Sequence, residues 1–331
     1  MTTIIMKNEE FPIVIIGATG FIGEHFVNTI LSETNSHIFV LVHKTSIKLK
    51  GFEDRITFFK GDVLDYPSVE KLIKPNSIVI NLCYLGNGTR KENLTAISNL
   101  INACKFRKAK RLIQCSTAVI CGRSSANIIT EDTIDEPYSE YEKIKLDIEN
   151  LLIRELRHDD QELAILRPTC VFGPNGKNLV MLINDIHSGN RVKNYLKSCL
   201  QHKRTMNLVS VHNVTSALLF LTNYKKIINC ETFIISDDEY HGNNFRYIEK
   251  YIQQALHVKD YKFFRILLPS ILLSFILKLA RKSNTNPKRV FQSKKLKTYG
   301  WRKERELEEE LLSFFSWHIQ SNKLKDEKNK R

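Results

Sequence analysis

Residues 11–23 read FPIVIIGATGFIG, a short apolar run followed by glycines at positions 17, 20 and 23. Because the run is rich in β-branched side chains, it predicts a buried strand. Beyond the glycines, Phe26, Val27, Ile30 and Leu31 recur at helical spacing, so a helix follows the turn. The stretch therefore predicts a strand, a glycine turn and a helix at the start of the fold.

The same alternation continues through the first half of the chain. Strand-like runs occupy residues 37–42, 56–59, 77–82, 111–115 and 162–166, and helix-like stretches occupy residues 66–73, 91–106 and 139–157. Such alternation predicts right-handed β-α-β units and a parallel sheet covered on both faces. After residue 173 the elements become shorter and mixed, with a late strand-like run at 232–236. We expect an α/β fold, a Rossmann-type doubly wound sheet with a smaller carboxyl-terminal α/β lobe.

Three glycines between a strand and a helix have a chemical use. They permit a tight turn, close approach of the backbone to a pyrophosphate and close helix packing, while the helix amino end offers free N–H groups to the anion. The flanking strand and helix distinguish this stretch from an ordinary glycine turn. It predicts a dinucleotide site formed by Gly17, Thr19, Gly20, Phe21, Ile22 and Gly23.

The spacing G-x-x-G-x-x-G resembles the short-chain dehydrogenase/reductase family, and GATGFIG is typical of its extended branch. Gly61-Asp62-Val63 resembles the family's adenine contact, which implies that Asp62 and Val63 bind the cofactor. An alternative is that Asp62 only caps the following helix. The resemblance also implies that Leu82 and Pro168 lie beside the cofactor.

The end of the second predicted strand bears on which cofactor is used. Residues 41–44 read LVHK, without the carboxylate that would bind the ribose 2′-hydroxyl of NAD. His43 and Lys44 are placed to face a 2′-phosphate, so the sequence favours NADP over NAD. The alternative is that both are simply exposed basic residues.

Tyr141 and Lys145 stand four residues apart, on one face of a predicted helix. In the family the lysine cation favours the ionised phenol and holds the nicotinamide ribose, so the tyrosine exchanges a proton with the substrate. Residues 116–122, STAVICG, resemble the family's S-S/T-x-x-V-Y-G stretch. This implies that Thr117 is the catalytic hydroxyl and Ser116 a substrate contact.

Asn93 matches the family's helix asparagine that supports the site, with a surface helix cap as the alternative. The resemblance spans residues 11–315, through LRPTCVFGP at 166–174, VSVHNV at 209–214 and GW at 300–301. It is nearest to the nucleotide-sugar epimerase/dehydratase group, which implies substrate binding by Asn178 and Arg204. Arg289 is a third such candidate, with a solvated arginine as its alternative.

The resemblance implies an NAD(P)-dependent nucleotide-sugar oxidoreductase acting at sugar C4, in polysaccharide or O-antigen sugar biosynthesis. A 4-epimerase removes a hydride and returns it to the other face, whereas a 4-ketoreductase only adds one. Both use the same catalytic residues, so the sequence leaves them open. Two alternatives remain: a steroid, flavonoid or small-alcohol dehydrogenase of the same fold, and a non-catalytic dinucleotide sensor.

These assignments divide the chain. We expect residues 1–173 to bind the dinucleotide and to hold the catalytic residues, and residues 174–317 to form mainly a substrate-binding lobe with some segments returning to the sheet. Residues 318–331 are expected to form a charged, flexible tail. Family resemblance also implies a homodimer.

Charge and composition limit the classes of partner that we expect. Lys and Arg number 50 against 36 Asp and Glu, a net charge of +14, which favours an anionic ligand. No aromatic-interleaved basic stripe accompanies it, so we expect no nucleic acid partner. The seven cysteines form no C-x-x-C pair, and residues 1–10 do not resemble a secretory signal. We expect no metal and a cytoplasmic protein.

Residues 266–280 read ILLPSILLSFILKLA and are nearly all apolar. A membrane-spanning helix needs about 20 such residues, and this run is shorter and is interrupted by Pro269 and Lys278. We expect a buried helix here and no contact with a membrane; the alternative is a helix that lies on a membrane surface.

Overall fold

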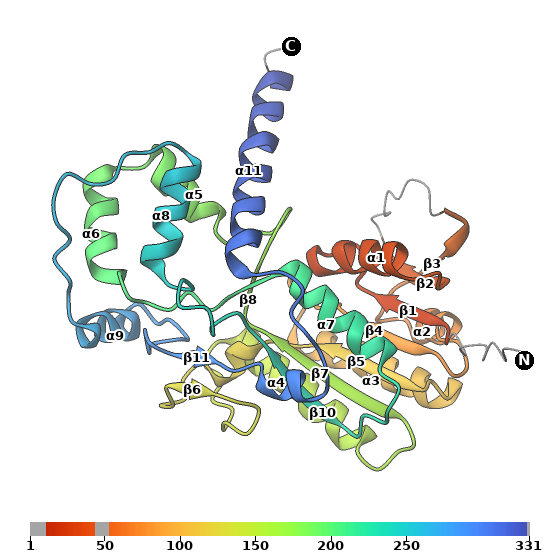
Figure 1. The fold of residues 1–331 in the computed structure, drawn as a ribbon. Coiled ribbons are helices and arrows are strands. Elements are labelled where there is room, and N and C mark those ends of the chain that lie inside the picture. Colours follow the sequence, from red (N-terminus) through yellow and green to blue (C-terminus); the bar gives the residue numbers. More distant parts are fainter. Residues whose placement is uncertain (1–10, 44–52, 330–331) are drawn as a thin grey trace, which may run out of the picture. The chain divides into compact units, whose positions relative to one another are not determined.

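The computed structural model describes residues 11–43 and 53–329 (Figure 1). The chain divides into two compact units whose segments interleave along the sequence. Unit 1 takes its described residues from the ranges Met1–Cys115, Asp147–Ile165 and Leu218–Glu231. Unit 2 takes them from Ser116–Leu146, Leu166–Ala217 and Thr232–Arg331.

A parallel sheet forms the centre of unit 1. Its strands are β1 (Ile13–Ile16), β2 (Ile38–Val42), β3 (Ile56–Lys60), β4 (Ile78–Asn81) and β5 (Arg111–Cys115). With β7 (Glu162–Pro168) and β10 (Glu231–Ile235), the strand order is β10-β7-β5-β4-β1-β2-β3. Ile13 of β1 pairs in parallel with both Ile38 and Ile78. The expected doubly wound α/β fold is confirmed, with the order reversing between β1 and β4, where such sheets bind ligands.

The helices of the first half begin and end close to their predicted positions. They are α1 (Phe21–Glu33), α2 (Tyr66–Leu72), α3 (Arg90–Arg107) and α4 (Glu140–Leu156), with the 3-10 turn η1 (Glu53–Arg55) before β3. Helix α1 buries Phe26, Val27, Ile30 and Leu31, the stripe that its sequence predicts. Helix α7 (Val211–Asn223) follows later in the chain.

Unit 2 consists mainly of helices with two small parallel sheets. Strands β6 (Ile128–Ile129) and β11 (Val290–Phe291) form one sheet, and β8 (Cys170–Phe172) and β9 (Leu208–Ser210) form the other. Its helices are α5 (Val180–Ser188), α6 (Arg191–Gln201), α8 (Phe245–Ala255), α9 (Ser270–Leu279), α10 (Lys294–Thr298) and α11 (Leu307–Asn329), with the 3-10 turn η2 (Ala118–Cys121). Phe172, Ile248 and Phe314 belong to one hydrophobic core that joins β8, α8 and α11.

Two expectations for the last third of the chain differ from the structure. Helix α11 continues to Asn329, so residues 318–329 are helical where we expected a flexible tail. The reason is that Leu311 and Phe314 anchor the first turns in the core and the Lys- and Glu-containing sequence beyond them is compatible with a helix.

The prediction of a buried helix in residues 266–280 is wrong. Helix α9 buries only Leu273 and Leu277, and Ile271 on its other side is 81% exposed. The rest of the fold covers only the stripe of α9 that contains Leu273 and Leu277. The apolar composition of the segment does not show how much of the helix will be covered. Within residues 11–43 and 53–329, no helix is both long and apolar enough to cross a bilayer.

A buried ion pair joins distant segments of unit 1. Arg111 in β5 donates to Glu162 Oε2 through Nε (2.8 Å) and Nη2 (2.5 Å), and Nη1 donates to the Leu221 carbonyl at 2.6 Å. The same carboxylate oxygen accepts the Ile228 N–H at 2.9 Å. The pair therefore connects β5, β7, the end of α7 and the segment beyond it.

Replacing Glu162 with Gln should lower the free energy of unfolding by about 3–5 kcal/mol, because the Arg111 cation is left buried without its counter-ion. Glu155→Gln is a matched control, since Glu155 pairs with Lys105 at 3.7 Å on the surface, and should cost less than about 1 kcal/mol. Urea unfolding followed by circular dichroism measures both. Equal losses would show that burial of the Arg111–Glu162 pair does not matter.

Candidate functional site

The glycine turn of unit 1 is pressed against the end of β4. Gly17 has φ of +84°, and a Cβ there would lie 2.6 Å from the Cys83 amide nitrogen. A Cβ on Gly23 would lie 2.2 Å from the Gly17 carbonyl oxygen. Both contacts are far shorter than van der Waals distance, so only glycine fits at these positions.

The amino end of α1 has the features of an anion site. Its N-cap is Gly20, which provides no side-chain cap, and the Gly20 N–H donates to the Gly17 carbonyl at 3.1 Å. The first amides of a helix have no partner within the helix and attract negative charge. Thr19, Phe21 and Ile22 are half-buried around this turn. The cradle therefore fits the pyrophosphate of a dinucleotide.

His43 and Asp62, both predicted to bind cofactor, lie together after β2 and β3. The His43 Nε2 and Asp62 Oδ2 atoms are 3.6 Å apart, and Asp62 Oδ1 accepts the Leu64 N–H at 3.0 Å. The alternative that Asp62 caps helix α2 is wrong, because Asp65 is the N-cap and accepts from the Ser68 N–H. Lys44 lies outside the described residues.

Asn93 is buried in α3 and holds the loop that follows β4. Its Nδ2 donates to the Leu85 carbonyl at 3.1 Å, and its Oδ1 accepts the Leu85 N–H at 3.0 Å. The alternative of a surface helix cap is wrong, because Thr89 caps α3 in a capping box with Glu92. Val63, also predicted to bind cofactor, lines one narrow hollow of about 10 Å³ with Asn93. Leu82, another such residue, donates its N–H to the Ile16 carbonyl.

In unit 2, a capping box sets the start of the helix that carries the predicted acid/base pair. Glu142 accepts from the Tyr138 N–H at 2.7 Å and from Ser139 Oγ at 2.8 Å, and Ser139 Oγ accepts the Glu142 N–H. Tyr141 therefore lies in the first turn of α4 and is 40% exposed. Lys145, one turn later, is only 5% exposed.

The turn that contains Thr117 packs against this helix start. A Cβ on Gly122 would lie 2.8 Å from the Val119 carbonyl oxygen and 3.2 Å from Glu142 Oε2. Thr117 and Ser116 are both buried, and Thr117 Oγ1 accepts the Val119 N–H at 3.4 Å. Glu142 is not among the residues predicted from the sequence, although Ser139 three residues before it is the signature of a capping box.

The backbone of this turn is tied to β7. The Ser116 N–H donates to the Leu166 carbonyl at 2.7 Å, and Arg167 forms a bidentate pair with Asp135 at 2.9 and 2.8 Å. Pro168, which ends β7, is buried. These contacts fix the loops on which the predicted catalytic hydroxyl stands.

Three separately predicted substrate residues, Asn178, Arg204 and Arg289, line one pocket of about 450 Å³ in unit 2. We call it the Arg204 pocket. Val119 and Gly122 also line it, so it borders the turn that carries Thr117. Among the described residues, Thr169 Oγ1 and Arg289 Nε are buried without a hydrogen-bond partner. Thr169 also lines the pocket and was not singled out by its sequence.

Arg289 is not a solvated arginine, so that alternative is wrong. It is 1% exposed, and its Nη1 donates to the Gly122 carbonyl at 2.6 Å while Nη2 donates to the Ser124 carbonyl. Burial lowers the pKa of its guanidinium. Two of its nitrogens thus shape the turn, and Nε is the donor left for a ligand.

Arg204 is the more available cation of the pocket. Its Nη1 donates to Gln201 Oε1 at 3.1 Å, and burial lowers its pKa from the usual range. Lys197, also in the lining, is paired with Asp185 at 3.1 Å. Asn178 donates its Nδ2 to the Val171 carbonyl at 2.6 Å, which orients its amide.

Asp238 braces the wall of the Arg204 pocket from behind. It accepts from Asn207 Nδ2 at 2.6 Å and from the Phe291 N–H at 2.9 Å, and both Asn207 and Phe291 line the pocket. Burial raises the pKa of this carboxyl to about 7. The pocket wall is therefore held by an acid that titrates near neutral pH.

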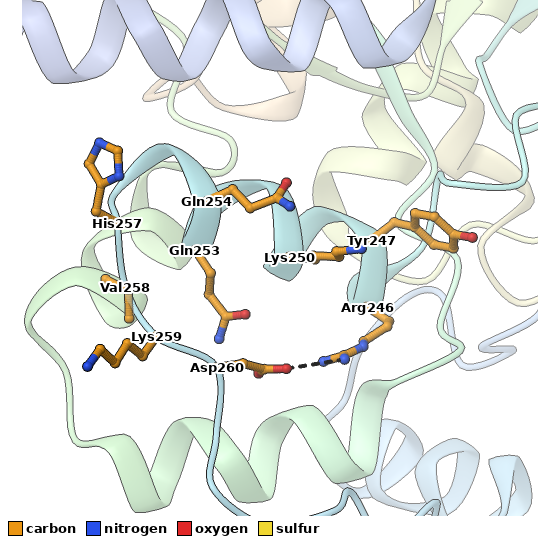
Figure 2. Close-up of a pocket in the computed structure, with 9 residues that line it drawn as sticks. All are labelled: Arg246, Tyr247, Lys250, Gln253, Gln254, His257, Val258, Lys259 and Asp260. Atoms are coloured by element: carbon orange, nitrogen blue, oxygen red, sulfur yellow. Dashed lines mark hydrogen bonds and ion pairs between the residues drawn. The ribbon is translucent and has the colours of Figure 1, made fainter.

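A second pocket of about 720 Å³ lies beside α8 (Figure 2). Arg246, Lys250 and Gln253 line it from the helix, and Asp260 lies opposite, joined to Arg246 at 3.4 Å. Its lining holds none of the sequence-predicted site residues that the structure describes. The chemistry expected from the sequence therefore points to the Arg204 pocket.

Comparisons with known proteins agree with this fold. The chain is 24% identical to a UDP-glucose 4-epimerase from Vibrio cholerae over 239 residues, 68% of this chain and 70% of that protein. Its structure is similar to UDP-glucose 4-epimerase of Thermotoga maritima solved with UDP-glucose, with TM-score 0.68 and 19% identity over 94% of this chain and 99% of that one.

It is likewise similar to UDP-glucuronic acid 4-epimerase from Bacillus cereus in complex with UDP-glucuronic acid and NAD, with TM-score 0.67 and 20% identity over 94% and 99% of the two chains. At these identities the structural likeness establishes the fold. A family profile, however, matches residues 13–235. Because that match spans the glycine turn, Thr117 and the helix with Tyr141 and Lys145, the chain belongs to the NAD dependent epimerase/dehydratase family.

Proposed function

We propose that the protein is an NAD-dependent 4-epimerase of a nucleoside-diphosphate sugar. The Arg204 pocket carries this proposal. It combines a partly buried arginine, an asparagine amide and two buried polar atoms without partners. Such groups suit a polar, anionic ligand, because a buried donor or acceptor gains most when a ligand supplies its hydrogen bond.

The lining argues against the alternative of a steroid or small-alcohol dehydrogenase. Besides Arg204, it contains the polar side chains of Lys197, Gln201, Asn207 and Asn284. An apolar ligand would dehydrate these groups without offering them hydrogen bonds, which costs free energy. A diphosphate with a sugar would engage them.

The pairing of His43 with Asp62 supports NAD over NADP, against the preference that the sequence suggested. A carboxylate 3.6 Å from the imidazole places negative charge at the end of β2 and β3, where it would repel a 2′-phosphate. The relative from Bacillus cereus was solved with NAD, and the family is described as NAD dependent. The NADP preference finds no support in these relatives.

Chemically, the bound dinucleotide supplies the acceptor and the donor of a hydride. The chain itself supplies proton transfer and orientation. Tyr141 would take the proton of the substrate 4-hydroxyl and later return it, with the Lys145 ammonium stabilising the phenolate. Thr117 would donate a hydrogen bond to the same oxygen, and Arg204 with Asn178 would hold the diphosphate.

Epimerisation is favoured over simple ketoreduction because the relatives named above are 4-epimerases. An epimerase regenerates its cofactor within each cycle. A ketoreductase would instead need fresh reduced cofactor at each turnover. The two reactions therefore differ in what the purified protein retains.

Denaturing the purified protein should release NAD, because an epimerase has no need to exchange it. Chromatography with mass detection identifies the nucleotide. Released NADP(H) would contradict the cofactor assignment and favour a reductase. A protein that is empty and also fails to bind added NAD would contradict the dinucleotide site itself.

Replacing Tyr141 with Phe should lower kcat for interconversion of the C4 epimers of a UDP-sugar by about 10²–10⁴-fold, because it removes the general acid/base. Binding of NAD should persist. Tyr138→Phe is a matched control, since Tyr138 stands just before the same helix and is similarly exposed; its activity should be near that of the unaltered protein. Retained turnover in the Tyr141 variant would exclude the acid/base role.

Replacing Arg204 with Gln should raise KM for the UDP-sugar by roughly 10–100-fold, because a charge-assisted bond to the diphosphate is lost. The value of kcat should change little, since this contact is the same in ground and transition states. The exposed neighbour gives the control Lys203→Gln, which should leave both constants unchanged. Steady-state kinetics distinguish the outcomes, and an unaltered KM for the Arg204 variant would remove this residue from the substrate site.

A further inference from the structure

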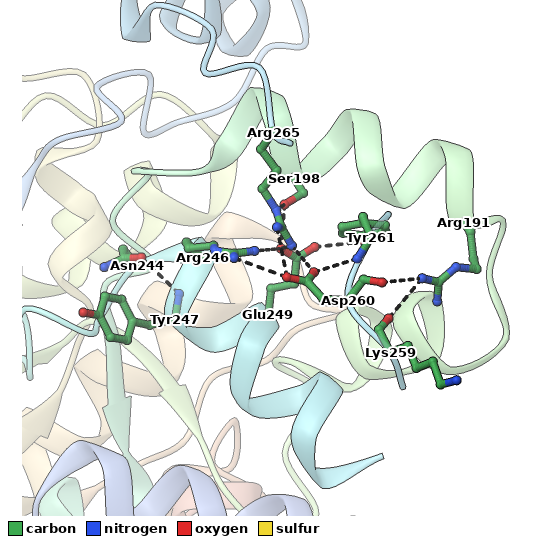
Figure 3. Close-up of polar contacts among 10 residues, drawn as sticks. All are labelled: Arg191, Ser198, Asn244, Arg246, Tyr247, Glu249, Lys259, Asp260, Tyr261 and Arg265. Carbon is green, nitrogen blue, oxygen red and sulfur yellow. Dashed lines mark hydrogen bonds and ion pairs between the residues drawn. The ribbon is translucent and has the colours of Figure 1, made fainter. Parts of the chain in front are cut away.

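The segment that joins α8 to α9, residues 256–269, is bound to unit 2 through its polar side chains. We call it the strap. Arg265 donates to Ser198 Oγ at 2.7 Å and to Glu249 Oε2 at 3.4 Å, while the Tyr261 hydroxyl donates to Glu249 Oε1 at 3.0 Å (Figure 3). The Arg265 side chain is only 8% exposed and that of Glu249 only 2%. Arg265 and Tyr261 of the strap thus face inward, whereas Lys259, Asp260 and Lys262 are exposed.

A second set of contacts fixes the start of the strap on α6. Arg191 donates to the carbonyls of Lys259 and Asp260 at 3.0 and 3.1 Å, as Figure 3 shows. Tyr195 packs edge-on against Tyr261, with ring centroids 5.6 Å apart, and its hydroxyl donates to the Phe264 carbonyl. These bonds hold the backbone of the strap in one position along α6.

Although Arg265 is largely buried, the strap presents apolar side chains to the outside. Phe263 is 74% exposed, Phe264 98%, Ile266 69% and Leu267 54%. This is the reverse of the usual arrangement, in which apolar groups lie inside and charges outside. Since the buried ion pairs hold the strap this way, the exposure of these side chains is a property of the fold.

Helix α9 continues the exposed apolar surface. Ile271, Leu272, Phe275 and Leu279 are exposed, and at about 100° per residue they occupy one contiguous side of the helix. Leu273 and Leu277, on the opposite side, are buried. The helix therefore uses one apolar side for packing and leaves a second apolar side open.

Helix α6 joins the same surface along the strap. Val192 and Leu196 are 67% and 60% exposed, and with Phe263 they line an open groove of about 840 Å³ between α6 and the strap. Leu267 and Leu273 lie with the end of α6 around a further hollow. We call this combined face of α6, the strap and α9 the apolar surface. Contiguous patches of this kind mark interaction sites.

Basic side chains outnumber acidic ones around the apolar surface. Residues 186–230 and residues 261–303 contain no Asp or Glu. Exposed basic side chains stand on each of its three elements or directly after them: Lys193, Lys203, Lys262, Lys278, Arg281, Lys282 and Lys288. The acids nearest to it, Asp185, Glu249 and Asp260, are each paired with a cation.

We propose that the apolar surface docks the protein on the anionic headgroup surface of a lipid bilayer. The exposed Phe, Leu and Ile side chains enter the boundary between headgroups and acyl chains, while the surrounding Lys and Arg contact lipid phosphates. This placement needs no membrane-spanning helix. Arg204, a predicted substrate residue, borders this surface at the hollow beside the end of α6.

A second copy of the chain is a poorer occupant of this surface. A two-fold contact would bring the same basic side chains of both copies face to face, and Asp185 and Asp260 beside them are already paired with cations. Like charges across an interface disfavour association. An anionic bilayer satisfies both the apolar area and the positive charge.

Flotation of the purified full chain with vesicles tests the proposal. The protein should float with vesicles of phosphatidylcholine mixed with phosphatidylglycerol, and roughly tenfold less with phosphatidylcholine alone or in high salt, because several charges contribute. Ile271→Ser and Phe264→Ser should each lower the partition coefficient by about tenfold, the effect of removing one buried apolar side chain.

Ile227→Ser provides the matched control, since Ile227 is a 71% exposed isoleucine in unit 1, and it should float like the unaltered protein. Thermal unfolding establishes that all variants are folded. Flotation does not measure activity, so its outcome does not depend on the proposed enzymatic function. Absence of flotation with anionic vesicles would overturn the proposal. So would a dimer in light scattering that Ile271→Ser dissociates while flotation stays unchanged.

Discussion

Residue 17 can carry no side chain, because a Cβ there would meet the backbone of Leu82 and Cys83 at less than 3 Å. This contact presses the turn after β1 onto the end of β4, where the strand order of the sheet reverses. Gly23 is under the same constraint, since a Cβ added there would clash with the Gly17 carbonyl oxygen. The amino end of α1 is thereby held open beside the sheet edge. The proposed dinucleotide site depends on this close approach of two backbones.

In unit 2, polar groups divide between building the site and remaining available to a ligand. Both carboxylate oxygens of Glu142 accept hydrogen bonds at the start of α4. The Nη atoms of Arg289 donate to the carbonyls of Gly122 and Ser124, in the turn that precedes α4. What remains for a ligand is small and specific: the Arg289 Nε atom, the Thr169 hydroxyl and the Arg204 guanidinium. Arg289 thus both fixes the turn at the pocket wall and lines the pocket itself.

The strap shows a different use of buried charge. The contacts of Arg265 and Tyr261 with Glu249 are buried, and buried pairs are costly to form unless their geometry is good. Here they fix a segment with its apolar side outward, which hydrophobic burial alone would not do. The result is a surface that is both apolar and basic, with Arg204 bordering it near the end of α6.

The alternation of short apolar runs with helical patterns was sufficient to predict the strands, the helices and the doubly wound sheet, because periodicity is a local property that each element displays in its own residues. The glycine turn was recognisable for the same reason, since its spacing and its flanking elements are contiguous. Resemblance to a family added Tyr141, Lys145 and Thr117, whose roles in this chain remain predictions.

Tertiary structure alone decided which distant residues meet. That Asn178, Arg204 and Arg289 share one pocket depends on the folding of three separate segments. That Asp62 pairs with His43 instead of capping α2, that Asn93 clamps a loop, and that α9 is half exposed are likewise outcomes of packing between segments. Local sequence states what a residue can bond with, but burial and partners depend on which other parts of the chain arrive beside it.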